Sequence, residues 1–143
     1  MISINTYFNF QGNTEDAMNF YKTVFGGEFT IFQRFRDMPG CEKMPAEDQN
    51  KIMHISLSTP KGYVFMATDA LESMEQKLLF GNNYHIIVHT ENEAETDRLF
   101  NALSSGGKVE MPLNKTFWGA YCGMCRDKFN VQWMVNYTYP QKQ

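Results

Sequence analysis

The chain has 143 residues, of which 43% are hydrophobic, 15% aromatic and 20% charged, and its net charge is −3. This length suits one ordinary domain or two small fused modules, and this composition favours a packed core over disorder. No basic run is present that could follow a phosphate backbone, so we expect no nucleic-acid partner.

The first residues show no basic segment followed by an apolar run, so we expect no signal peptide. No apolar run approaches the ~20 residues that cross a bilayer, so we expect no membrane partner. Cys41, Cys122 and Cys125 are an odd number of cysteines, which fits reduced thiols better than a disulfide framework. Together these features predict a cytoplasmic protein.

Alternating and helical periodicities divide the first half of the chain into strands and one helix. Residues 2–10 alternate as a strand does, and a helix follows with Asn13 or Thr14 as its N-cap and its end at Gly26. Residues 37–51 contain proline and glycine and predict a long loop, which in compact domains is usually functional or mobile. Further strands are expected at 28–35, 52–58 and 63–68.

The second half begins after a less regular stretch, residues 69–83, and opens with a strand at 84–89. A helix follows, with Asn92 as its N-cap and Glu95 completing a capping-box-like pair. Its predicted apolar face comprises Ala94, Leu99, Phe100, Ala102 and Leu103. Glycine at 106 and 107 ends this helix, as glycine does at the end of the first one.

Aromatic, β-branched and small residues fill 119–126 and 131–138, on either side of a polar turn at 127–130. This pattern predicts a β-hairpin. Cys122 and Cys125 have the C-x-x-C spacing, but positions i and i+3 of a strand point to opposite faces. We therefore interpret them as ordinary buried thiols rather than as a redox pair.

The two halves repeat one another. Phe20 and Gly26 are six positions apart, as are Phe100 and Gly106, and each pair belongs to a helix that follows a strand. We expect an α+β fold of two βαβββ modules, although the strand after the second helix is hard to place. Each helix should cover the outer face of a curved sheet, with the other sheet faces around a cavity. The modules are expected at about 1–70 and 84–143, with a linker at about 70–83, in a single domain spanning 1–143.

Paired modules of this kind resemble the vicinal oxygen chelate superfamily, which includes glyoxalase I, extradiol dioxygenases and the fosfomycin and bleomycin resistance proteins. The order and spacing of several short motifs resemble its PhnB-like branch over nearly the whole chain. These motifs are Phe8–Asn13, Phe20-Tyr21, Phe25–Gly27, Phe117–Gly119 and Asp127–Phe129. The resemblance implies a homodimer and the glyoxalase/bleomycin resistance/dioxygenase fold, without naming a reaction.

The superfamily's enzymes place metal ligands on strands that face the cavity, two in each module. By resemblance these positions fall on Thr6, on Met66 or Ala67, on His85 and on Met134, so only His85 is a good ligand. Divalent ions need three or more nitrogen or oxygen donors. We therefore expect no metal and no other cofactor.

A shifted metal site is the alternative. It would use His85, with His54 as a second nitrogen donor if the two strands are adjacent. Asp69 would complete it if the chain turns inward after Thr68.

Tyr7, His54, His85, Phe117, Trp118 and Met134 are the residues expected to contact a small-molecule ligand in an aromatic-lined cavity. For Phe117 and Trp118 a core or dimer contact is an equal alternative to a ligand platform. One hypothesis is a metal-assisted enzyme of the glyoxalase type. The alternative is a metal-free protein that binds or sequesters a small molecule, and a third is a structural dimer whose pocket is filled by its own side chains. The sequence leaves open whether a reaction is catalysed.

Overall fold

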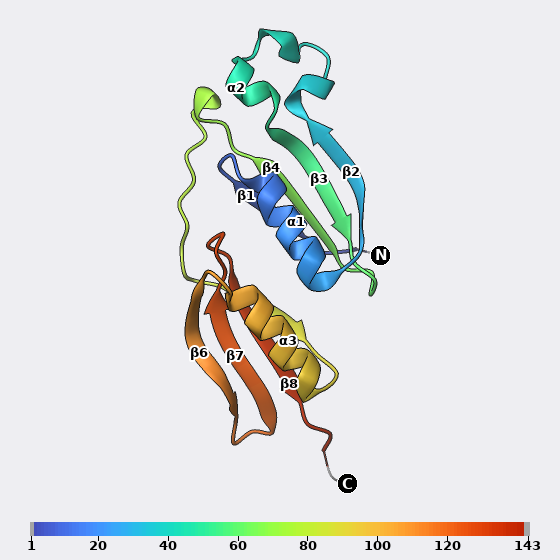
Figure 1. Ribbon diagram of the computed structural model, residues 1–143, viewed down its shortest axis with the longest axis vertical. Helices are drawn as coiled ribbons and strands as arrows, with labels where there is room; N and C mark the ends of the chain where they lie inside the picture. The colour runs from blue at the N-terminus through green and yellow to red at the C-terminus, as the bar shows by residue number, and fades with distance from the viewer. Residues whose placement is uncertain (1, 142–143) are drawn as a thin grey trace. The chain divides into compact units, whose positions relative to one another are not determined.

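The computed structural model describes residues 2–141 and divides the chain into two units, Met1–Leu79 and Phe80–Gln143 (Figure 1). Each unit contains one four-stranded sheet and one long helix that packs against it. The strands and helices occur in the order strand, helix, strand, strand, strand in both units. This confirms the predicted α+β fold of two βαβββ modules.

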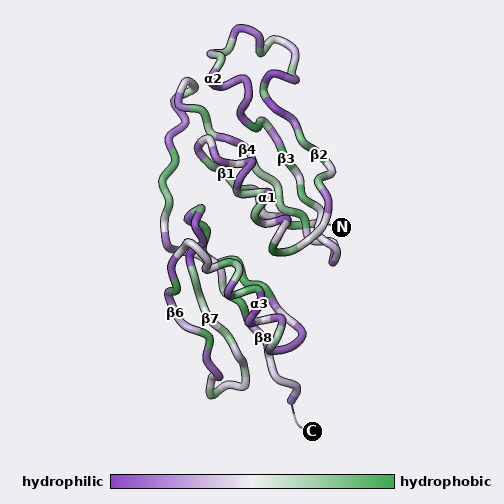
Figure 2. Tube along the Cα trace, viewed as in Figure 1, coloured by the Kyte–Doolittle hydropathy of each residue, from purple (hydrophilic) through white to green (hydrophobic). Residues whose placement is uncertain are grey.

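The first unit is built on a mixed sheet in the order β1-β4-β3-β2. Strand β1 pairs with β4 in parallel, and the other neighbours are antiparallel. The segment between β2 and β3 is mostly hydrophilic and forms short helical turns rather than an unstructured loop (Figure 2). The elements are β1 (Thr6–Phe10), α1 (Thr14–Phe25), β2 (Glu28–Arg34), η1 (Phe35–Asp37), η2 (Cys41–Lys43), α2 (Ala46–Gln49), β3 (Ile52–Ser58), β4 (Val64–Asp69) and η3 (Glu72–Met74).

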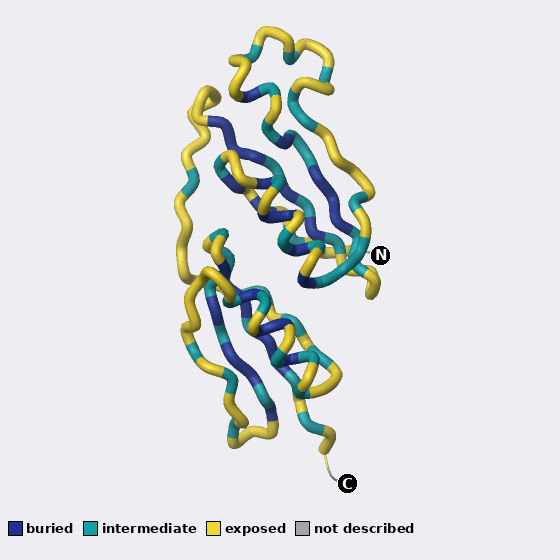
Figure 3. Tube along the Cα trace, in the orientation of Figure 1, coloured by how far each residue is buried: buried dark blue, intermediate teal, exposed yellow. Residues whose placement is uncertain are grey.

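The core of the first unit lies between α1 and one face of this sheet. The ring of Tyr21 stacks on Phe8 at 5.3 Å between centroids and lies 6.1 Å from Phe65. Ile55 and Leu57 of the central strand β3 are fully buried, and Figure 3 shows burial concentrated along the central strands and the inner helix face. Aromatic contacts of this kind supply much of the apolar area that a small unit buries.

The first strand is shorter than the alternation at 2–10 predicts. It begins at Thr6, and Ile2 and Ile4 are 89% and 85% exposed. The reason is the length of its partner, because β4 begins at Val64 and the register pairs Thr6 with Phe65. Residues 2–5 therefore have no partner strand in this sheet.

The second unit repeats the topology of the first, in the order β5-β8-β7-β6 with β5 parallel to β8. The strand that was hard to place is β6, an edge strand that contains Pro112. Proline is tolerated there because an edge strand need not donate every amide to a neighbour. The elements are β5 (Ile86–His89), α3 (Glu93–Ser104), β6 (Lys108–Lys115), β7 (Ala120–Arg126) and β8 (Gln132–Thr138).

The second helix packs through Leu99, Phe100 and Leu103, which are buried, but the prediction for Ala94 is wrong because that residue is exposed. The prediction of Asn92 as the N-cap is confirmed, whereas the carboxylate of Glu95 accepts from the amide of Glu91 at 3.2 Å rather than from that of Asn92. The side chain of Asn92 accepts a hydrogen bond from the amide of Glu95 at 2.8 Å. These contacts fix α3 on its sheet.

No helix among residues 2–141 has the length and apolarity to cross a membrane.

The repeat extends to the hairpin loops at residues 59–63 and 127–131. In both loops the first amide donates to the fifth carbonyl, at 2.9 and 2.8 Å, and the fourth amide donates to the first carbonyl at 3.0 Å. The fourth residue has a positive φ in both, 84° at Gly62 and 70° at Asn130. Glycine and asparagine are the residues that adopt this conformation most easily.

One glycine after each long helix lies against the backbone of the same sheet. A Cβ added to Gly27 would lie 2.1 Å from the carbonyl oxygen of Ser58, and one added to Gly107 would lie 2.1 Å from that of Arg126. Ser58 ends β3 and Arg126 ends β7, so the close approach occupies the same place in both units. Glycine is required there because no side chain fits.

The carboxylate of Asp69, at the end of β4, joins the beginnings of α1 and β3. Its Oδ1 accepts hydrogen bonds from the amides of Gly12 at 3.0 Å and Thr14 at 3.1 Å, and its Oδ2 accepts one from Ile52 at 2.8 Å. Of the two predicted caps, Asn13 occupies the N-cap position but its side chain makes no capping hydrogen bond, and Thr14 is the first residue of the helix. A carboxylate distant in sequence caps the helix instead, as its polarity favours.

Replacing Asp69 with alanine should lower the free energy of unfolding by about 3 kcal/mol, because buried amide donors would lose their acceptor. Urea unfolding followed by circular dichroism measures the change. The matched control is Asp16→Ala, an exposed carboxylate in the first turn of the same helix, with an expected loss below about 1 kcal/mol. Equal losses in the two variants would contradict this role of Asp69.

Candidate functional site

Each sheet has one face covered by its helix and one face that the helix does not cover, which we call the open face. In the first unit Phe8 and Phe65 contact Tyr21 of α1, so they mark the helix side. Neighbouring residues of a strand point to opposite faces. Tyr7 and Met66, which pair with one another, therefore lie on the open face.

Two of the predicted ligand-binding residues meet on the open face of the first unit. The rings of Tyr7 and His54 stack at 5.8 Å between centroids, with 28° between their planes. Tyr7 is 48% exposed, so this flat aromatic surface is accessible on the open face of the first unit. Thr6, the expected first metal position, lies on the helix side, where its hydroxyl hydrogen-bonds to that of Tyr63.

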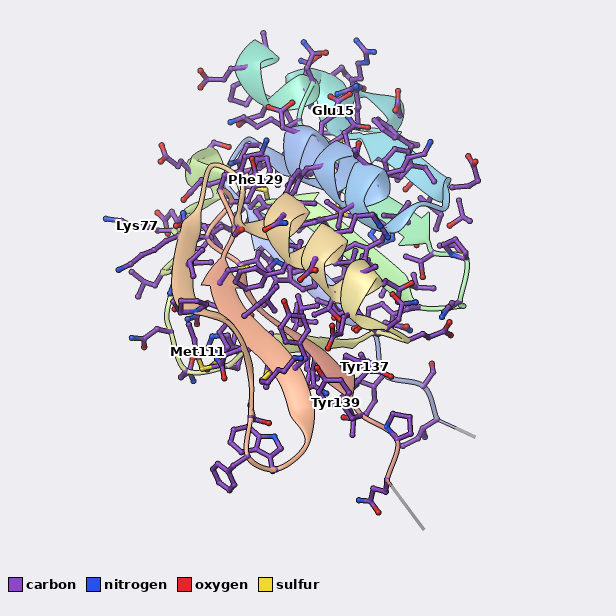
Figure 4. The ribbon with its side chains drawn as sticks, turned by 60° about the horizontal axis from the view of Figure 1, so that its bottom comes forward. Glu15, Lys77, Met111, Phe129, Tyr137 and Tyr139 are labelled. Carbon is purple, nitrogen blue, oxygen red and sulfur yellow. The ribbon has the colours of Figure 1, made fainter. Side chains whose placement is uncertain are left out.

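In the second unit the helix side is marked by two tyrosines. The hydroxyl of Tyr121 on β7 donates to Asp97 of α3 at 2.6 Å, and this bond and burial raise the pKa of Tyr121 to about 12. The hydroxyl of Tyr139 bonds to Glu93 at the start of the same helix. Figure 4 shows the rings of Tyr137 and Tyr139 beside one another at the end of β8.

The middle of the open face of the second unit is a row of three methionines. Met111, Met124 and Met134 are paired across β6, β7 and β8, and all three are half-buried. We call these residues the methionine row. Ile87 of β5 pairs with Met134 and continues the row to the other edge of the sheet. Methionine is flexible and polarisable, so a surface of this kind can adapt to an apolar or aromatic molecule.

A polar cluster lies beside the methionine row. Glu110 receives hydrogen bonds on both carboxylate oxygens, from His85 Nε2 at 3.0 Å and from Gln132 Nε2 at 2.8 Å. Desolvation alone would raise the pKa of Glu110, but the hydrogen bonds from His85 and Gln132 and the positive charge of Arg126 outweigh it and lower that pKa. Glu110 is therefore a carboxylate at neutral pH.

This cluster joins the two opposite edges of the sheet. His85 immediately precedes β5 and Glu110 belongs to β6, with β8 and β7 between them. Three strand intervals amount to ~14 Å, so the two side chains must reach toward one another over the intervening strands. A register irregularity between Val109 and Met111 lies at Glu110, and a bulge of this kind redirects a side chain.

Phe117 and Trp118 are not on either open face. They occupy the tip of the turn between β6 and β7, where Thr116 and Ala120 are hydrogen-bonded across the turn at 2.7 Å. The two side chains are 97% and 62% exposed, and their rings meet edge to face at 4.9 Å. This places two of the predicted ligand-binding residues at the end of a hairpin.

The cysteines of the C-x-x-C pair point to opposite faces, as expected for a strand. Cys122 pairs with Asn136 and Cys125 with Trp133, and both thiols are free and buried. Burial raises the pKa of Cys122, and burial with the nearby carboxylates raises that of Cys125 to about 12. A thiol with a raised pKa is a poor nucleophile and a poor metal ligand at neutral pH.

The residues at the superfamily's metal positions do not fit a divalent ion. Thr6 and His85 are engaged by Tyr63 and Glu110, and the oxygens of Asp69 are taken by backbone amides. His54 and His85 belong to different units. Within residues 2–141 there is no group of three or more His, Cys, Asp or Glu side chains arranged to hold a metal. We therefore derive no chemistry through a metal.

Comparison with known proteins places the chain in a family. The family model for 3-demethylubiquinone-9 3-methyltransferase matches residues 2–136. The chain belongs to this family. This chain is similar to a solved structure from Bacillus cereus, described as a putative 3-demethylubiquinone-9 3-methyltransferase, PhnB protein. The TM-score is 0.79 and the identity 25%, over 96% of this chain and 100% of that one.

Two further relatives match this chain over almost its whole length. Protein YjdN of Escherichia coli (strain K12) is 28% identical over 146 residues, or 96% of this chain and 97% of YjdN. Protein PA1353 from Pseudomonas aeruginosa, known from a crystal structure, is 36% identical with a TM-score of 0.84, over 96% of this chain and 98% of that one. Neither name states a reaction.

The fold is shared more widely. A glyoxalase/bleomycin resistance protein/dioxygenase family enzyme from Burkholderia phytofirmans PsJN has a TM-score of 0.61 and 18% identity, over 94% of this chain and 98% of that one. The family model and the Bacillus cereus structure confirm the resemblance to the PhnB-like branch, and the Burkholderia enzyme confirms the predicted glyoxalase/bleomycin resistance/dioxygenase fold. At this identity the comparison with the Burkholderia enzyme concerns the fold alone.

Elemental analysis of untagged protein, purified without chelator or nickel resin, should show far less than one equivalent of zinc, nickel, manganese or iron. The physical reason is the shortage of free nitrogen and oxygen donors. One equivalent of metal that is lost in His85→Gln or in His54→Gln would contradict this expectation. It would restore the shifted site built on these histidines.

Proposed function

We propose that this protein binds a small organic molecule on the open face of its second unit, with the apolar part of the ligand on the methionine row. The observation that supports the proposal is the arrangement of that face. Three adaptable apolar side chains lie in line across three strands, and a fixed polar cluster lies beside them. Ligand sites commonly combine an apolar surface with a few well-placed polar groups.

The first unit contributes a second surface to the proposal. The stacked rings of Tyr7 and His54 offer a flat aromatic platform on its own open face. A ligand with an aromatic ring would be favoured there by stacking. The proposed site therefore uses fewer aromatic residues than the sequence analysis lists, and methionine takes much of their place on the second sheet.

The proposed binding is metal-free, in the manner of a binding or sequestration protein. The donor set described above supports this choice over a metal-assisted enzyme of the glyoxalase type. Methyl transfer, which the family's name describes, would require a site for an adenosyl cofactor. The loop between β1 and α1 contains the single glycine Gly12 and that between β5 and α3 contains none, so neither has the glycine-rich pattern of a dinucleotide-type fold. We assign no reaction.

A screen of small aromatic and anionic compounds by thermal shift, followed by calorimetry, tests the proposal. Bound compounds should raise the melting temperature by mass action. Met134→Arg should weaken binding of these compounds at least tenfold, because a charged side chain would occupy the centre of the methionine row. The control is Met74→Arg, at an exposed position of η3, with unchanged affinity. Equal affinities in both variants, or no ligand for the native protein, would refute the proposal.

We also propose that the protein is a cytoplasmic homodimer. The free thiols of Cys41, Cys122 and Cys125 support a reducing location. Exposed aromatic side chains at the tip of the β6–β7 turn support self-association, because such surfaces are commonly covered by a partner.

Sedimentation velocity should give twice the chain mass of 16.6 kDa. The double variant Phe117→Ser with Trp118→Ser should raise the dimer dissociation constant at least tenfold, since it removes the apolar tip. Tyr84→Ser, another exposed aromatic position of the second unit, is the control and should leave the dimer intact. A native protein that sediments as a single chain at all concentrations would exclude the dimer.

A further inference from the structure

We propose that Nδ1 of His85 is a hydrogen-bond acceptor that makes the open face of the second unit selective for aromatic molecules with a neutral hydroxyl group, such as phenols. This inference rests on the proposed function. It adds the chemical class of ligand and the residue that selects it.

The tautomer follows from the contact with Glu110. The lowered pKa keeps Glu110 ionised, and an ionised carboxylate has no proton to donate. The bond of 3.0 Å between this carboxylate and His85 Nε2 therefore requires that Nε2 carry the proton. In a neutral imidazole the other nitrogen is then an acceptor, so Nδ1 presents a lone pair.

Glu110, the carboxylate that orients this acceptor, is itself held in place by neighbouring side chains. Gln132 donates to the second oxygen of Glu110 at 2.8 Å, so the carboxylate is held at both oxygens. Arg126, which pairs with Gln132 across the sheet, adds a positive charge near the same carboxylate. The side chain of His85 is 26% exposed, and no hydrogen bond from its Nδ1 to another group occurs within residues 2–141. The imidazole is thus oriented by Glu110, part of its side chain is exposed, and its Nδ1 is left for a ligand.

The distance to the methionine row suits one aromatic ring. His85 lies two positions before Ile87, which pairs with Met134, and Gln132 lies two positions before Met134 itself. Two positions along a strand are ~7 Å, and residues at this spacing share a face. A ring on Met134 can therefore direct a hydroxyl substituent at the acceptor. Sulfur–aromatic contacts would hold the ring in place.

The arrangement predicts discrimination against the methyl ether of the same molecule. The ether has no proton to donate, so it would displace water from Nδ1 and leave this nitrogen unpaired. Sites built to bond a hydroxyl reject analogues that lack it. Selection of this kind differs from simple apolar binding, which would hold the phenol and its ether equally well.

The probes are 4-methylphenol and 4-methylanisole, titrated into protein labelled with ¹³C at the methionine methyl groups and followed by NMR. Both compounds should shift the methyl signals of Met124 and Met134. The phenol should bind at least tenfold more tightly to the native protein. His85→Phe should bind both compounds equally, since it keeps a ring and lacks the acceptor.

The matched control is His89→Phe. His89 ends β5, the strand that His85 precedes, and its Nδ1 already lies 3.4 Å from the side-chain amide of Asn136, so the variant should keep the preference for the phenol. Glu110→Gln is a second test of the same idea, because an amide can donate to Nε2 and reverse the tautomer. It should bind the ether as the native protein does and lose the preference for the phenol.

Equal affinity of the native protein for the two probes would overturn this inference and leave the proposed function standing, provided the methionine signals move. A preference for the phenol that survives in His85→Phe would also overturn it. If neither probe binds, phenol selectivity is excluded, and the Met134→Arg comparison in the compound screen decides the proposed function separately.

Discussion

Each sheet of this protein has one long helix, and one helix covers only one face of a four-stranded sheet. The sequence is divided accordingly. Residues on the helix side of the sheets, such as Phe65, Leu57 and Trp133, are aromatic or branched and buried, as a core requires. Residues on the other face do not pack against the helix of their own unit. The methionine row and the cluster at Glu110 exist because the fold leaves that face without a helix.

This division gives a single physical reading of the proposed function. An apolar row alone would bind by area, with little selection among ligands of similar shape. A polar cluster alone would remain hydrated. Beside one another on the same face, they allow an apolar contact and a directional hydrogen bond in one ligand. The two relatives of known structure and the Burkholderia enzyme share the fold. Their shared fold therefore identifies the surface to be studied, while the side chains on it determine the chemistry.

The sequence predicted most of the fold because local patterns and long-range contacts agree in it. The hairpin of β7 and β8 was readable from alternating strand formers around a polar turn, and Asn92 and Glu95 marked the second helix. The errors arose where a distant residue decided the outcome. Thr6 begins the first strand because β4 begins at Val64, and no local signal carries that information.

The candidate site was less predictable for the same reason. The sequence predicts that His85 and Met134 face the cavity, but which side chains lie beside them depends on the register between strands. Glu110 was missed because a bulge turns its side chain toward the open face, which alternation cannot show. Asp69, taken as a possible metal ligand, is instead a buried acceptor for the backbone amides of segments that are far apart in sequence.

The paired glycines Gly27 and Gly107 carry an implication for the history of the chain. The same backbone approach and the same loop hydrogen bonds occur in both units, which is expected if an ancestral unit was duplicated and fused. The features retained in both copies are those that shape the backbone. The stacked ring pair of one copy and the thioethers of the other have meanwhile diverged. Fold and recognition are thus encoded in separate sets of positions, so selection can alter the ligand of one copy while the scaffold of both is preserved.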